Sequence, residues 1–315
     1  MKKAGKTGGK GWKTVRLINR SLDIAILIVV LFFVAADLYA AWDSRQAYEW
    51  AKPVHYEIYK PTAETESHSF EELREINPEV FGWLTVYGTN IDYPIVQGDD
   101  NQKYVNTNAL GQYSLSGAIF LDARCSIDFT DFPSIFYGHH MEKQAMFGEI
   151  GQFSEVEFFD VHQYGMLYYD EQEHGLEFFA FVQCDAYDGE VFRTRIAEPE
   201  EREAYLEFFA ELALHTRDVQ VTADDRIVLL STCSNSTTNS RDILAGKVTD
   251  EVYEDTFITA DTRNPLMVDG LAGLWALLPL WGALMSIILP VTLSALLISW
   301  LFTLISKKRG TKRRL

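Results

Sequence analysis

Residues 227–234 read Ile-Val-Leu-Leu-Ser-Thr-Cys-Ser, and the chain continues as Asn-Ser-Thr-Thr-Asn-Ser through residue 240. An apolar, β-branched run therefore ends in a thiol and passes directly into small polar residues. This change in composition predicts a buried strand that opens to solvent at Cys233. Most lone cysteines are buried structural residues, so the role of Cys233 depends on what the rest of the chain places beside it.

The same layout occurs upstream, where residues 135–141 read Ile-Phe-Tyr-Gly-His-His-Met. Downstream, Arg241 opens another apolar stretch. We expect Cys233, His139 and Arg241 to lie at the ends of three strands and to meet in one cleft. Taken singly, Arg241 fits a surface salt bridge and His140 fits a solvent-facing residue. Together, Cys233, His139 and Arg241 at three strand ends favour a functional site.

Short apolar runs separated by turns fill the middle of the chain, a pattern typical of strands. We expect eight strands, over residues 82–87, 91–96, 117–122, 134–137, 166–169, 176–183, 226–230 and 243–248. A short helix over residues 69–78 precedes them, and a long helix is expected over residues 198–216, where acids crowd the first turn. The sequence therefore predicts a mostly β fold: a closed β-barrel with N-terminal helices and a long helix inserted before the last two strands.

Two uncharged or nearly uncharged apolar segments flank this region. Residues 21–41 are long enough for a membrane-spanning helix, which needs roughly 20 residues, although a cleaved signal peptide is the alternative. Residues 271–305 carry no charge, and Pro279 and Pro290 interrupt them. Because proline breaks a helix, we expect the second transmembrane helix over residues 284–305.

The charge distribution indicates the orientation. All seven charged residues before residue 21 are basic, as are all six after residue 305. Basic flanks stay on the cytoplasmic side, so we expect both termini inside and residues 42–270 outside. That middle region holds 15 of the 28 basic and 43 of the 45 acidic residues, a net charge of −28, which disfavours a nucleic-acid partner.

The expected organisation has seven parts. They are a basic tail (1–20), a transmembrane anchor (21–41), a stalk or linker (42–68), a folded domain (69–260), an interfacial linker (261–283), a second span (284–305) and a basic tail (306–315). The folded domain contains all three candidate strand ends, so it is the part of the chain that carries the chemistry.

The three cysteines, Cys125, Cys184 and Cys233, are too few and of the wrong parity for a disulfide framework. A bridge between the first two stays open. No Cys/His cluster has the spacing of a zinc site. An odd thiol in an extracytoplasmic domain needs a reason, and catalysis is one.

These residue types suit acyl transfer. A cysteine is nucleophilic as its thiolate, which a nearby imidazolium or guanidinium favours. His139 can support that form and protonate the amine that leaves when a peptide bond breaks. Arg241 is always charged and suits a developing oxyanion. We therefore predict Cys233 as nucleophile, His139 as general acid and base, and Arg241 as the group that stabilises oxyanion and substrate.

At this point the sequence resembles the sortases, and within them class B. Leu230-Ser-Thr-Cys233 is similar to the family's nucleophile motif, residues 137–141 to its histidine motif, and Arg241 to its arginine. The resemblance spans roughly residues 70–255. It includes residues 88–97, Tyr104-Val-Asn106 and residues 117–124, Gly-Ala-Ile-Phe-Leu-Asp-Ala-Arg, and the long helix resembles class B rather than class A. Position 125, where Asn is usual, is Cys.

The resemblance implies a membrane-anchored cysteine transpeptidase without metal or other cofactor. It would cleave a C-terminal sorting signal, Asn-Pro-x-Thr or Leu-Pro-x-Thr in type, at Thr and transfer the acyl group to an amine of the cell wall. We expect Ser231, Thr232, Tyr137 and Asn106 to contact the substrate. The implied partners are sorting-signal-bearing surface proteins, a peptidoglycan precursor or pilin amine, and membrane lipid, at the plasma membrane of a Gram-positive-type bacterium.

Other functions stay open. A second transmembrane span is typical of the pilin-polymerising sortases of class C, although residues 42–70 lack the Asp-Pro of their lid motif. A sortase that joins pilin subunits through a lysine is therefore the first alternative. A non-catalytic surface domain that binds cell-wall peptides is the second, and a plain cysteine peptidase is the third.

Overall fold

The computed structural model describes residues 9–61, 68–233 and 239–257. The expected second transmembrane helix at 284–305 lies outside the described residues. The described residues fall into two units, of which the first ends at Asp43 and the second is the described part of Ser44–Thr259. The second unit carries all the candidate site residues.

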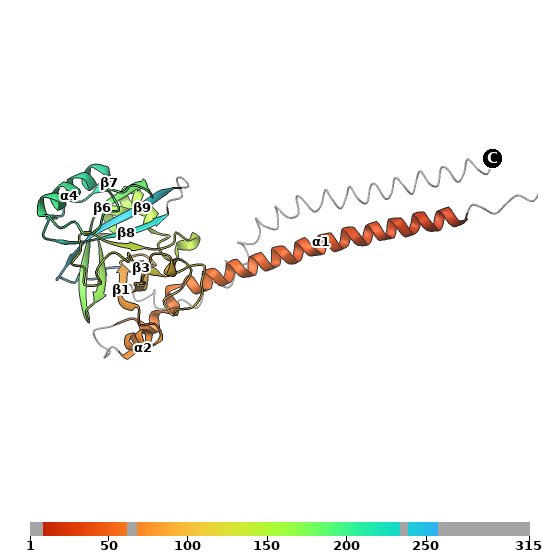
Figure 1. Ribbon diagram of the computed structural model, residues 1–315, viewed down its shortest axis with the longest axis horizontal. Helices are drawn as coiled ribbons and strands as arrows, with labels where there is room; N and C mark the ends of the chain where they lie inside the picture. Colours follow the sequence, from red (N-terminus) through yellow and green to blue (C-terminus); the bar gives the residue numbers. More distant parts are fainter. Residues whose placement is uncertain (1–8, 62–67, 234–238, 258–315) are drawn as a thin grey trace, which may run out of the picture. The chain divides into compact units, whose positions relative to one another are not determined.

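A single long helix, α1 (Gly9–Ala51), begins the described chain (Figure 1). Its segment Val15–Ala40 has 26 residues and a mean hydropathy of 2.5, so it is long and apolar enough to cross a membrane. Apolar side chains such as Leu27 and Phe32 are more than half exposed on it. Within the described part of the chain it is the one helix with these properties.

The unit Ser44–Thr259 is built on a closed barrel. Its described strands are β1 (Val80–Val86), β2 (Asp92–Val96), β3 (Ile119–Leu121), β4 (Ser134–Tyr137), β5 (Tyr164–Tyr169), β6 (Gln172–Asp185), β7 (Ala213–Thr216), β8 (Arg226–Cys233) and β9 (Ser240–Thr249). The order is β5-β1-β2-β3-β4-β8-β9-β6, and β6 pairs back to β5. The β2–β3 and β4–β8 pairs are parallel. The predicted closed barrel of about eight strands is confirmed.

Helices precede the barrel, as expected. After α1 come two short turns of 3-10 helix, η1 (Pro53–His55) and η2 (Glu57–Tyr59), and then α2 (His68–Ile76). Residues expected as a stalk pack on the barrel: Ala51 and Tyr56 are buried, and Tyr93 Oη donates to Ala51 O at 2.7 Å. The remaining helical segments are η3 (Lys103–Val105), η4 (Glu142–Gln144), η5 (Ile150–Ser154), α3 (Val156–Val161) and α4 (Pro199–Leu212).

The expected long helix over residues 198–216 is too long at its C-terminal end. Helix α4 stops at Leu212, and the next four residues form β7 beside β6, so α4 precedes the last three strands instead of the last two. The physical reason is the length of β6. Its first half pairs with β5 to close the ring, whereas Ala180–Val182 lies beyond that closure and would leave an unpaired edge. Strand β7 supplies the missing backbone partners.

Alternation along β8 separates two cores, because neighbouring residues on a strand point to opposite faces. Val228 and Leu230 belong to the cluster inside the barrel, whereas Ile227 and Leu229 belong to a second cluster beneath α4. That second cluster also contains Phe132, Ile135, Ala180, Val182, Tyr205, Phe209, Ile243 and Ala245. Helix α4 thus covers the outer face of strands β4, β8, β9 and β6, and Cys233 continues the outer row.

Candidate active site

Cys233 and Arg241 lie directly opposite each other on β8 and β9. Each continues the outer row of its strand, after Leu229 on β8 and before Ile243 on β9. Nη1 of Arg241 donates a hydrogen bond to Cys233 Sγ at 2.7 Å. Cys233 is exposed and Arg241 is half-buried. A permanent cation is therefore held against a thiol that a substrate can reach.

His139 follows the end of β4, which runs parallel to β8 with Tyr137 opposite Ser231. The N–H of Gly138 donates to Ser231 O at 3.2 Å, so the pairing continues past the strand end. Two residues beyond the Tyr137–Ser231 pair on both chains, the continued register brings His139 level with Cys233. The strand ends that carry the predicted nucleophile and the predicted acid and base thus lie side by side.

The imidazole of His139 is held by the backbone of η3. Its Nε2 lies 2.8 Å from the carbonyl oxygen of Val105. A carbonyl oxygen only accepts hydrogen bonds, so Nε2 carries the hydrogen in this contact. Nδ1 is then the ring nitrogen that remains for proton exchange. Val105 contributes only its backbone, so no side-chain pattern in the sequence points to it.

The two residues before Cys233 point to opposite faces. Thr232 faces the barrel interior, is 2% exposed, and its Oγ1 donates to Gly138 O at 2.8 Å. From this position the hydroxyl of Thr232 does not reach a substrate, contrary to the expectation. Its hydrogen bond instead joins β8 to the segment that carries His139. Ser231 shares the outer face with Cys233. It is 1% exposed, and its Oγ has no hydrogen-bond partner among the residues that the structure describes.

Tyr137 and Asn106, the other two expected substrate contacts, are each close in the chain to a residue of this arrangement. The hydroxyl of Tyr137 donates to Asp122 Oδ2 at 3.1 Å, so the ring is the part of this side chain left for other contacts. Asn106 is exposed and directly follows Val105, the residue that holds His139. Both residues are thus next to groups that position the site.

All three cysteines are free thiols, so the bridge between Cys125 and Cys184 that the sequence left open is not formed. Cys184 lies opposite Arg241 on β6. Burial is the main cause that raises the pKa of Cys184 to about 12 and that of Cys125 to about 11. Both stay protonated near neutral pH, so neither supplies the thiolate that nucleophilic attack requires.

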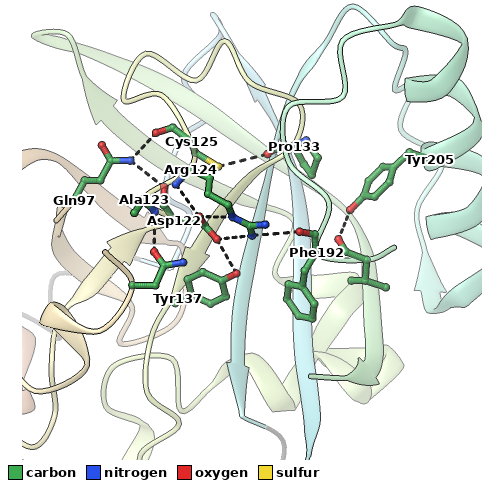
Figure 2. A network of polar contacts seen from close by, with 11 residues as sticks. Gln97, Asp122, Ala123, Arg124, Cys125, Pro133, Tyr137, Phe192 and Tyr205 are labelled. Carbon is green, nitrogen blue, oxygen red and sulfur yellow. Dashed lines mark hydrogen bonds and ion pairs between the residues drawn. The ribbon is translucent and has the colours of Figure 1, made fainter. Parts of the chain in front are cut away.

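An ion pair between the buried carboxylate of Asp122 and the exposed side chain of Arg124 lies next to Tyr137 (Figure 2). The carboxylate of Asp122 accepts hydrogen bonds from Arg124 Nε at 2.9 Å and Arg124 Nη2 at 2.8 Å. The signal available in the sequence was an Asp-Ala-Arg run immediately after an apolar strand. Its meaning depends on Tyr137, which the chain brings in from the neighbouring strand β4.

The side chains at the site are a thiol, an imidazole and a guanidinium. These supply a nucleophile, a proton carrier and a fixed cation, the groups that acyl transfer through a thioester needs. Within the described ranges, no group of three or more His, Cys, Asp or Glu side chains is arranged to hold a metal ion.

The chain is similar to proteins called sortase B. It is 30% identical over 227 residues to Sortase B of Listeria monocytogenes, covering 70% of this chain and 92% of the relative. The crystal structure of sortase B from the Type II pilus of Streptococcus pneumoniae is 46% identical, with a TM-score of 0.52, and covers 58% of this chain and 99% of that one. The structure of a Streptococcus pyogenes class B sortase involved in pilus biogenesis is 37% identical, with a TM-score of 0.53. That match covers 58% of this chain and 100% of the other. A scan against protein-family models finds none that matches.

Coverage of 92% of the Listeria protein means that the similarity takes in nearly the whole relative rather than one shared motif. The structural neighbours are covered almost end to end as well. The resemblance stated from the motifs is confirmed, and the non-catalytic alternative is set aside. The chain belongs to the class B sortases and is a cysteine transpeptidase.

Proposed function

We propose that Cys233 is the nucleophile that cleaves a C-terminal sorting signal at Thr. The sulfur attacks the Thr carbonyl carbon, the C–N bond breaks, and His139 protonates the departing amine. The resulting thioester links the substrate to Cys233. An incoming amine then attacks the thioester carbon and gives a proton to His139, and the C–S bond breaks to release Cys233 as its thiolate. The observation that carries this proposal is the 2.7 Å contact between Arg241 Nη1 and Cys233 Sγ at the level of His139.

The contact between His139 Nε2 and Val105 O assigns the two ring nitrogens different tasks. Nε2–H is committed to the carbonyl oxygen, so we assign the proton transfers with substrate and acceptor to Nδ1. A fixed hydrogen bond on one nitrogen orients the ring and sets its tautomer. This arrangement lets one histidine act first as acid and then as base without turning its ring.

Arg241 stabilises the negative charge that moves from sulfur to the substrate oxygen during attack. A guanidinium suits this role because it keeps its charge and has several N–H donors in one plane. Ser231 stays the expected substrate contact on the face of Cys233: its hydroxyl has no partner among the described residues but is 1% exposed, so this contact requires the groups that cover it to move when substrate binds. Asn106 and the ring of Tyr137 contact the substrate in this proposal, and Thr232 aligns the two strand ends from the other face.

The acceptor amine belongs to the cell wall in our first proposal, as a peptidoglycan cross-bridge or precursor. The second candidate is a pilin lysine, because two solved relatives at 46% and 37% identity are named for a pilus or for pilus biogenesis. Thioester turnover measured with a cross-bridge peptide amine and with a pilin-derived lysine peptide distinguishes them. The preferred acceptor is the one that raises product formation more steeply with concentration.

The helix segment Val15–Ala40 anchors the protein in our proposal, with the basic N-terminal tail in the cytoplasm and residues 69–260, the catalytic domain, outside. The substrates are then sorting-signal-bearing surface proteins at the plasma membrane of a Gram-positive-type bacterium. Protease added to intact protoplasts is expected to digest the domain and to spare the N-terminal tail. Digestion of the tail with protection of the domain would overturn this orientation.

The decisive test of the chemistry is a trapping experiment. A peptide that ends in a thiol-reactive Thr analogue is incubated with the full-length protein, and the adduct is mapped by mass spectrometry. We expect modification at Cys233, none in Cys233→Ala and a strongly slowed reaction in His139→Ala. Modification at Cys184 or Cys125 instead, or an undiminished rate in His139→Ala, would sink the mechanism.

A further inference from the structure

The carboxylate of Asp122 is the centre of a network beside the site (Figure 2). It is fully buried and has two hydrogen bonds at each oxygen. Oδ1 accepts from the backbone N–H and the Nε of Arg124, both at 2.9 Å. Oδ2 accepts from Arg124 Nη2 at 2.8 Å and from Tyr137 Oη at 3.1 Å. Burial raises the pKa of Asp122, but the hydrogen bonds and charge of Arg124 outweigh it and hold that pKa below its usual value.

The turn that carries this pair is itself held in place. Gln97 Nε2 donates to Asp122 O at 2.9 Å and to Cys125 O at 2.6 Å. The N–H of Ala123 donates to Asn101 Oδ1 at 2.7 Å. The Asp122–Arg124 pair therefore starts from a fixed base at the end of β3.

From that base the network reaches the segment between β6 and α4. Arg124 Nη2 donates to Phe192 O at 3.3 Å, and the Phe192 ring stacks on the ring of Tyr137 with centroids 6.4 Å apart. The preceding residue is held from α4, because Tyr205 Oη donates to Val191 O at 2.8 Å. Arg124 thus holds the backbone of Phe192, and Tyr137 packs against the ring of Phe192.

Tyr137 is also the residue that ties this network to the chemistry. It lies on the outer face of β4 opposite Ser231, two residues before His139 and level with the strand that ends at Cys233. We propose that Asp122 and Arg124 are positioning residues for substrate binding: they hold Tyr137 and Phe192 as one fixed wall beside Cys233. This inference rests on the proposed function, because it takes Cys233 as the nucleophile.

Such a wall acts on substrate binding and leaves the reacting atoms alone. Its two rings suit an apolar or proline side chain of the sorting signal. The contacts of Arg241 with Cys233 and of Val105 with His139 include no member of the network. A wall that contacts the substrate equally before and during reaction changes KM and leaves kcat unchanged.

The test uses the full-length enzyme in detergent with internally quenched peptides containing Asn-Pro-Gln-Thr or Leu-Pro-Gln-Thr. Arg124→Lys keeps the charge but loses the planar fork, and Tyr137→Phe removes one hydroxyl. We expect KM to rise about tenfold in Arg124→Lys and a few-fold in Tyr137→Phe, with kcat within about twofold of wild type. The double variant is expected to show less than the product of the two effects, because both act through Asp122.

Two controls separate this role from general damage. Arg74→Lys alters an exposed pair with Glu71 on α2 and is expected to leave KM unchanged. The rate at which iodoacetamide alkylates Cys233, followed by mass spectrometry, is expected to match wild type in every network variant. Partial unfolding would instead lower kcat and the melting temperature and leave KM alone.

The outcomes distinguish the two levels of inference. Peptide cleavage that persists in Cys233→Ala, or wild-type enzyme that cleaves neither peptide, overturns the proposed function. Cleavage that depends on Cys233 but shows the wild-type KM in both Arg124→Lys and Tyr137→Phe overturns the positioning role alone. A parallel fall in kcat and in the alkylation rate would also overturn it, because the network would then act on the reacting atoms.

Discussion

Thr232→Val tests whether the hydroxyl next to the nucleophile serves the strands or the substrate. The hydroxyl is buried and donates to Gly138 O at 2.8 Å, linking two residues 94 positions apart. Valine has nearly the same shape and suits a strand, so the change removes a hydrogen bond and leaves no cavity. A net hydrogen bond is worth about 1 kcal/mol, and leaving the carbonyl of the partly buried Gly138 without its donor raises the cost to about 1–3 kcal/mol.

We therefore expect Thr232→Val to lose about 2 kcal/mol of stability. For a unit the size of Ser44–Thr259, this corresponds to a fall in melting temperature of roughly 4–8 °C. Because the bond joins the strand of Cys233 to the segment of His139, looser alignment is expected to lower kcat roughly tenfold, with KM unchanged.

The assay pairs thermal melts with peptide-cleavage kinetics on the full-length enzyme. Thr249→Val is the matched control, since its hydroxyl also donates to a backbone carbonyl at 2.8 Å but in an exposed position. It is expected to shift the melting temperature by less than about 2 °C. A wild-type melting temperature combined with a raised KM in Thr232→Val would refute the reasoning and restore Thr232 as a substrate contact.

Three further predictions concern other contacts of the same unit. Arg241→Lys keeps the charge but loses the planar fork beside Cys233, so kcat for peptide cleavage is expected to fall about 100-fold; a fall of less than threefold would contradict the oxyanion role. The pKa of Asp122 lies below its usual value because the hydrogen bonds and charge of Arg124 outweigh burial. The stabilisation is therefore present above about pH 4 and is lost as pH falls through the lower folded-state pKa. Asp122→Asn should accordingly show a lower urea midpoint than wild type at pH 7, and the difference between the two midpoints should be smaller at pH 3. An equal difference at both pH values would exclude a contribution of Asp122 ionisation to stability. Tyr205→Phe removes the bond to Val191 O and is expected to cost about 1 kcal/mol in urea unfolding, whereas an unchanged midpoint would show that this bond does not hold α4 in place.

Local pattern predicted most of the barrel. Short apolar runs bounded by turn residues marked the eight strands of the closed ring, because strands are short and end where turn residues begin. The pattern missed β7 and extended the helix through it. Residues 213–216 follow a helical stretch without a turn signal, and their strand state depends on the open edge of β6 at Ala180–Val182. The unpaired edge of β6 exists only once the barrel has closed, so the sequence of residues 213–216 carries no signal that they pair with it.

The candidate site divides in the same way. Cys233, His139 and Arg241 were predicted from the sequence because each borders an apolar run, the first two at its end and Arg241 at its start. The groups that hold these residues were not predicted. Val105 binds His139 through a backbone carbonyl 34 residues away in the chain, and Gly138 accepts the hydrogen bond of Thr232 through its own backbone carbonyl.

What the sequence determined by itself was the chemistry: a thiol, an imidazole and a guanidinium at strand ends, and the family whose motifs they match. Only the tertiary structure decided which neighbours those groups have. Strand periodicity shows that Thr232 and Cys233 face opposite ways, yet it does not say which face is the barrel interior. That assignment follows from how all eight strands close and pack. The same closure brings Asp122, Tyr137 and Phe192 together from three separate parts of the chain, because register between distant strands is a property of the packed barrel.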